Sequence, residues 1–183
     1  MIGRWIALGS YAGAIWTTLG VAPRVANAVL ATPVGAWMVG RGAWVLAATA
    51  IVVLARGFAY RRASWGAWGL LGIAGAGYVL GLVWLRSQRI ERLHLPEYGV
   101  AAWLAWRAVV LIAGDGAAGY VAAVLVATGI GWSDELLQAL VPGRVYDLRD
   151  VVANALGAAL GVVVLAAVRM GGRRTPQSQT VWR

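Results

Sequence analysis

Long apolar runs constrain this chain more than any other feature of its sequence. A helix that crosses a bilayer needs about 20 mainly apolar residues, and six segments reach or approach that length. They cover residues 5–22, 35–55, 65–85, 97–113, 117–132 and 151–169, the fifth being the shortest. Because backbone groups in lipid must bond within their own segment, helices are favoured. The sequence therefore predicts an all-α, polytopic transmembrane helix bundle of about six helices.

Composition agrees with a membrane protein. The chain is 61% hydrophobic, far above the roughly half-apolar usage of soluble domains. Its net charge of +9 comes from arginine without any lysine, and these arginines lie mostly between the apolar runs. They are thus expected to face water and lipid phosphates. We expect membrane lipids as partners, no nucleic acid and no cofactor. The absence of cysteine excludes disulfides, thiolate metal sites and cysteine nucleophiles.

The polar residues are confined to one part of the chain. All seven carboxylates and the single histidine lie between Glu91 and Asp150, and the first 90 residues contain no acid. Most of these groups fall in two expected loops, 86–96 and 133–150. Two helices separate the loops, so both loops must emerge on the same membrane face. This arrangement predicts one polar site at that face.

His94 is the first candidate residue of that site. An imidazole at a membrane border can titrate near neutral pH or move a proton. If the protein is an enzyme, Asp134 and Glu135 are the candidate acid–base partners of His94. A histidine that only makes interfacial hydrogen bonds is the alternative. A divalent-metal site that adds Asp150 to these residues is chemically allowed, but the spacing matches no metal motif.

The second half of the site is denser. Asp134 and Gln138 lie one helical turn apart and share a face, and the following Pro142-Gly143 pair presents Arg144 in a turn. A polar stripe then enters the last helix at three- and four-residue spacing, through Asp147, Asp150, Asn154, Gly157 and Gly161. An unpaired buried amide costs about 1–3 kcal/mol, so Asn154 needs an interhelical partner.

Arg107 is expected near the middle of the fourth helix, where insertion costs roughly 2.5–3.5 kcal/mol. A buried partner, Asp134, Asp150 or Asp115, would offset that cost. Snorkelling of the side chain towards the nearer border is the alternative. The candidate substrate-binding residues are therefore Arg107, Gln138, Arg144, Asp147, Asp150 and Asn154.

Two GxxxG patterns indicate where helices approach closely. They begin at Gly77 and Gly157. Small residues at this spacing let helix backbones meet in lipid, so the patterns favour packing rather than chemistry.

The polar residues together resemble a known signature. His94 and Tyr98 are followed two helices later by a longer block of spaced residues. That block is Asp134-Glu135-x-x-Gln138-x-x-x-Pro142-Gly143-Arg144-x-x-Asp147-x-x-Asp150-Val151-x-x-Asn154-x-x-Gly157-x-x-x-Gly161. The pattern resembles the VanZ-like family of bacterial integral membrane proteins over about residues 65–169. Family members often carry lysine near Glu91 and serine near Asp147, and this chain departs at both places.

The resemblance implies a four-helix domain at 65–169. The apolar runs predict an N-terminal helical pair at 1–64, outside that match, and leave a basic, flexible tail at 170–183. The family's namesake is associated with antibiotic resistance, at a low level and against teicoplanin, which makes a site on the bacterial cell envelope credible. We expect a multi-pass protein of the bacterial inner membrane. The Arg61-Arg62 pair and the basic tail carry no neighbouring acids, which favours cytoplasmic termini. The first apolar run continues to Ala22 without a clear cleavage signature, so we expect it to be a retained helix.

Two functions fit this pattern. The polar site could bind, or act on, an anionic amphiphile such as a lipid-linked phosphate or a glycopeptide-like ligand, since arginine suits phosphate geometry. Alternatively, the chain is a non-catalytic accessory subunit of a larger membrane complex, and the stripe is an internal lock between helices.

Overall fold

A computed structural model gives the structure and describes residues 1–85 and 91–172. Every regular element in these ranges is helical, which confirms the expected all-α bundle. The elements are α1 (Ile2–Thr18), α2 (Ala22–Leu30), α3 (Pro33–Arg61), α4 (Trp65–Trp84), the 3₁₀ turn η1 (Glu91–Leu93), α5 (His94–Ala113), α6 (Ala117–Gln138) and α7 (Leu148–Gly172). Most of the predicted 170–183 tail lies outside the described residues.

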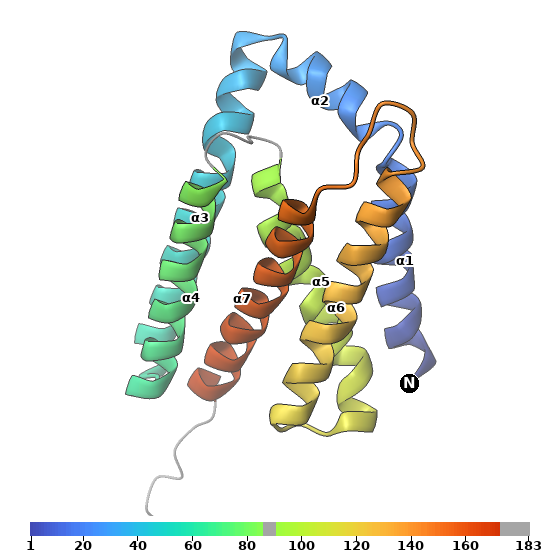
Figure 1. The fold of residues 1–183 in the computed structure, drawn as a ribbon. Coiled ribbons are helices and arrows are strands. Elements are labelled where there is room, and N and C mark those ends of the chain that lie inside the picture. The colour runs from blue at the N-terminus through green and yellow to red at the C-terminus, as the bar shows by residue number, and fades with distance from the viewer. Residues whose placement is uncertain (86–90, 173–183) are drawn as a thin grey trace, which may run out of the picture.

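Five helices in the described part of the chain are long and apolar enough to cross a membrane. Their spans are Trp44–Arg61, Trp65–Trp84, His94–Ala113, Ala117–Gln138 and Leu148–Gly172. The first expected segment forms α1, which has 17 residues and is not among the five. In Figure 1, α1 nevertheless runs alongside the bundle from its lower end to its upper end.

Short-range signals set several helix boundaries. The Thr32 hydroxyl accepts a hydrogen bond from the Gly35 backbone N–H at 3.0 Å and so caps α3. Between α5 and α6 the chain turns at Gly114, whose φ of +78° suits glycine. The expected hinge at 23–34 is mostly helical instead, as α2, because proline is compatible with a first helical turn. In Figure 1, α2 crosses the upper end of the bundle.

Helix α6 is longer than the sequence predicts. The apolar run that predicts it stops at Trp132. The helix continues to Gln138. Glutamate and glutamine are good helix formers, and the first helix-breaking pair comes only at Pro142-Gly143. The polar residues that were expected in a loop therefore lie within the last turns of a candidate span.

The centre of the bundle is formed by α4, α5, α6 and α7, and α5 packs against both α6 and α7. The remaining long helices lie on opposite flanks, as Figure 1 shows: α1 packs against α5 and α6, while α3 packs against α4 and α7. Leu8 and Ile15 of α1 belong to the same apolar cluster as the buried alanines of α5. The N-terminal helices α1 and α3 thus pack on opposite sides of the four central helices.

Glycine allows the closest helix crossing. A methyl group at Gly161 would lie 2.5 Å from the Cα atom of Gly99, and one at Gly157 would lie 2.6 Å from the carbonyl oxygen of Leu95. These are backbone atoms, so α5 and α7 touch without intervening side chains. The pattern that begins at Gly77 meets leucine side chains of neighbouring helices. The GxxxG patterns are confirmed as packing contacts.

Candidate functional site

The predicted polar residues gather at one end of the bundle. His94 opens α5, Asp134 and Gln138 lie in the last turns of α6, and Asp150 lies in the first turn of α7. In Figure 1 the start of α5 and the α6–α7 loop both lie at the upper end. The prediction that the two polar segments share a face is confirmed. We call the following residues the polar cluster: His94, Tyr98, Asp134, Glu135, Gln138, Arg144, Asp150 and Asn154.

Gln138 is the hub of this cluster. Its Nε2 donates to Glu135 Oε1 at 2.7 Å and to Asp134 Oδ2 at 3.3 Å. Its Oε1 accepts a hydrogen bond from Nη2 of Arg144. An amide carries donors at one end and an acceptor at the other. Gln138 therefore links two carboxylates to a guanidinium that does not need to touch them.

Glu135 fastens the α6–α7 loop to the bundle. Its side chain is fully buried, and its Oε2 accepts a hydrogen bond from the Asp147 backbone N–H at 3.3 Å. Oδ1 of Asp147 in turn accepts from the Arg149 backbone N–H at 2.8 Å, at the start of α7. Asp147 thus shapes the loop, whereas the guanidinium of Arg149 lies 5.9 Å from the centre of the Trp84 ring.

Tyr98 joins α5 to α6. Its hydroxyl donates to Asp134 Oδ2 at 3.2 Å, and the residue is completely buried. The His94 and Tyr98 rings stack with centroids 6.0 Å apart and planes 12° apart. Tyr98 was not among the predicted binding residues, although its position one turn after His94 places both on the same helix face.

Asn154 joins α7 to α6. Its Nδ2 donates to the carbonyl oxygen of Gly131 at 3.2 Å, which confirms that this amide has an interhelical partner. Gly131 is needed there, because a methyl group in its place would lie 2.7 Å from Cβ of Asn154. Sequence reasoning missed Gly131, and only its spacing of three residues before Asp134 places it on the same face.

Four buried atoms of the polar cluster have no hydrogen-bond partner among the described residues. They are Nδ1 of His94 and one Oδ1 each of Asp134, Asp150 and Asn154. Oδ1 of Asn154 is always an acceptor, and the two aspartate oxygens act purely as acceptors when their carboxyl groups are ionised. A buried polar atom without a partner costs about 1–3 kcal/mol. The polar cluster can therefore form hydrogen bonds with a bound ligand or with water.

Arg107 lies outside the polar cluster, and the prediction that it pairs with a buried carboxylate is wrong. Its side chain is exposed, with the guanidinium 5.0 Å from the centre of the Trp103 ring. Asp115, one of the expected partners, pairs with Arg169. Arg107 follows the buried Tyr98 by nine residues, about two and a half helical turns, so it faces the opposite side of α5.

The described residues contain no group of three or more His, Cys, Asp or Glu side chains that could hold a metal ion. The alternative of a divalent-metal site at His94, Asp134, Glu135 and Asp150 gains no support from this geometry.

One comparison with known proteins gives a match. The family model described as VanZ/LLP1 matches residues 68–169. This range runs from the first turns of α4 to near the end of α7 and contains every residue of the polar cluster. No curated protein and no solved structure matches the chain.

Proposed function

This chain belongs to the VanZ/LLP1 family, and we propose that its polar cluster binds the headgroup of an anionic amphiphile at one face of the membrane. The observation that carries the proposal is the set of four buried, unpaired polar atoms at one end of a bundle of candidate membrane spans. A headgroup enters such a site from the membrane border, where these atoms gather.

Arg144 supplies the attraction for anionic oxygens in this proposal. It is half-buried, and a guanidinium has five N–H donors in a fork that suits phosphate. Its hydrogen bond to Gln138 uses one guanidinium nitrogen. The other donors are then available for a phosphate oxygen.

The unpaired acceptor atoms of the polar cluster limit which functional groups the bound headgroup can carry. Phosphate oxygens cannot donate to the unpaired oxygens of Asp134, Asp150 and Asn154, so the headgroup also needs hydroxyl or amine donors. Lipid-linked phosphates that carry sugar hydroxyls and glycopeptide-like ligands meet both conditions. His94 and Asp134 would serve as an acid–base pair only if a bond of the bound headgroup is cleaved, so the experiments below measure binding.

The proposed orientation places the polar cluster outside the cytoplasm of a bacterial inner membrane. Arg61 and Arg62 end α3 at the opposite end of the bundle from the cluster (Figure 1). Arginine is enriched in cytoplasmic loops. An outward-facing cluster would meet the amphiphiles of the cell envelope.

Headgroup selectivity in mixed micelles tests the proposal. Phosphatidylglycerol is anionic and has hydroxyl donors, whereas phosphatidylcholine with the same acyl chains has a phosphate but no donor. At a hundredfold excess over its Kd a ligand stabilises the folded state by about 2.7 kcal/mol. In a chain of this size, that raises the Tm by roughly 5–10 °C. We expect this rise for phosphatidylglycerol and a much smaller one for phosphatidylcholine.

Variants at two arginines locate the binding. Arg144→Ala should abolish the preference for phosphatidylglycerol, and Arg144→Lys should keep part of it because the charge remains. Arg61→Ala is the matched control, since Arg61 is exposed at the other end of the bundle. Equal stabilisation by the two lipids in the wild type, or an unchanged preference in Arg144→Ala, would overturn the proposal.

A role as a non-catalytic accessory subunit is favoured by a different observation. Both ends of the Gln138 amide are bonded within the protein, so part of the cluster is an internal lock. Purification from native membranes in mild detergent tests this role. A stoichiometric partner protein would support it, and a lone chain would count against it.

A further inference from the structure

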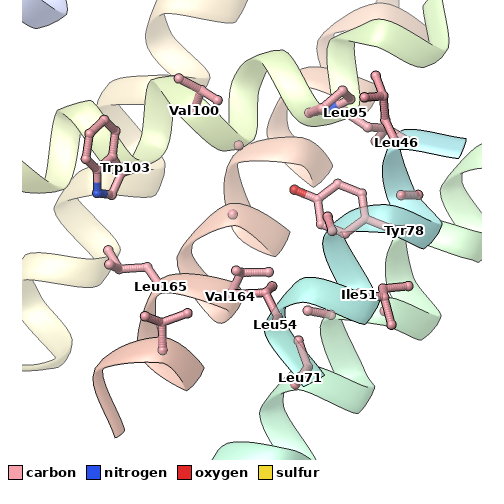
Figure 2. Close-up of a pocket in the computed structure, with 18 of the residues that line it drawn as sticks. Leu46, Ile51, Leu54, Leu71, Tyr78, Leu95, Val100, Trp103, Val164 and Leu165 are labelled. Atoms are coloured by element: carbon pink, nitrogen blue, oxygen red, sulfur yellow. The ribbon is translucent and has the colours of Figure 1, made fainter. Parts of the chain in front are cut away.

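A second candidate site lies outside the polar cluster. A cavity of about 560 Å³ opens between α3, α4, α5 and α7. Its lining is hydrocarbon except for the Tyr78 hydroxyl and the Trp103 indole N–H, and Figure 2 shows both side chains at its wall. None of the polar-cluster residues lines it. We call this space the apolar cavity.

The apolar cavity lies at membrane depth. All four helices around it contain candidate membrane spans, so hydrocarbon rather than water surrounds the bundle at this level. Its volume falls within the 300–1,000 Å³ that is common for ligand sites. Water is a poor occupant, because a space of this volume would hold many waters that each need two to four polar partners, and the lining side chains offer only two polar groups in all.

The outer wall is supplied by residues that the family model does not match. Leu46, Ile51 and Leu54 of α3 line the cavity (Figure 2), and the matched range begins only at residue 68. The opposite wall comes from α5 and α7, including Leu95, Val164 and Leu165. The apolar cavity therefore exists because α3 flanks the four helices that the family model covers.

We propose that the apolar cavity holds one acyl chain of a bilayer phospholipid, and that α3 forms the wall that retains it. The proposal is independent of the headgroup site, because the two sites share no residue. Leu95 lines the cavity, whereas its neighbour His94 belongs to the polar cluster, so the first turn of α5 separates the two sites.

Phospholipid that stays with the purified protein tests this proposal. The protein is washed extensively in detergent, and the phospholipid retained per chain is measured by native mass spectrometry. Gly75→Leu places a side chain in the cavity, next to Ile51. Gly72→Leu is its control, since Gly72 lies on the same helix with open space around it. We expect retained phospholipid in the wild type and in the control, and its loss in Gly75→Leu.

A second pair of variants guards against misfolding. Ala50→Trp fills the cavity from α3, and Ala48→Trp places the same side chain on that helix at a position that does not line the cavity. The proposal would be overturned if the cavity variants retained as much phospholipid as their controls, or if the wild type retained none. Arg144→Ala should retain the phospholipid. Loss in that variant with retention in Gly75→Leu would assign the lipid to the polar cluster and refute the acyl-chain site.

Discussion

The crossing of α5 and α7 gives the sharpest test of the packing. Gly161→Ala would place a methyl carbon 2.5 Å from Cα and 2.7 Å from the carbonyl oxygen of Gly99. Carbon atoms prefer a separation of about 3.5–4.0 Å, so the helices would have to part by about 1 Å. No rotamer change can relieve a contact between backbones. We therefore expect the upper part of the overpacking range, about 2–3 kcal/mol.

The control isolates this steric cost. Gly129→Ala introduces the same methyl group into α6, where nothing lies within 4 Å. Both substitutions gain the same helix propensity, up to about 1 kcal/mol, and this gain cancels in their difference. The free energy of unfolding is measured by titration with a denaturing detergent in mixed micelles, followed by circular dichroism. If Gly161→Ala is as stable as Gly129→Ala, the close helix crossing is refuted.

Three further predictions concern the polar residues and the topology. Asn154→Ala removes the hydrogen bond to the Gly131 carbonyl and should lower the free energy of unfolding by about 1 kcal/mol; an unchanged value in the same titration would show that the bond contributes nothing. Tyr98→Phe removes a hydroxyl donor from a buried carboxylate and should cost about 1.5–3 kcal/mol if that carboxylate is ionised, so a loss below this range would argue for a protonated acid. The chain has no cysteine, so cysteines placed at Val145 and Gly116 report sidedness: a membrane-impermeant maleimide should label the first in intact cells and the second only after permeabilisation, and the reverse pattern would invert the proposed orientation.

The sequence predicts the helices well because bilayer thickness sets their length. The run at 65–85 becomes α4 almost residue for residue. Prediction fails where polar residues extend a helix: α6 passes Trp132 because Gln138 pairs with acids one turn earlier. Apolar length alone cannot reveal such pairing. Its depth in the sequence predicts Arg107 as a site residue, whereas counting helical turns from Tyr98 places it on the opposite face of α5.

The cavity could not be predicted for a different reason. An internal space depends on how far helices stand apart, which no local pattern records. The lining residues of α3 are ordinary membrane residues, as suitable for facing lipid as for facing a cavity. Only their position opposite α5 and α7 distinguishes them.

The hydrogen bonds divide the polar cluster into two parts with different roles. Gln138 and Glu135 have partners at both ends of their polar groups, and these bonds tie α6 to the following loop. Asp150, Asn154 and His94 each keep an unpaired buried atom. A lock that served stability alone would gain from satisfying those atoms, since each costs about 1–3 kcal/mol. This division supports the proposal that the bonded part holds the helices in place while the unpaired part receives a headgroup.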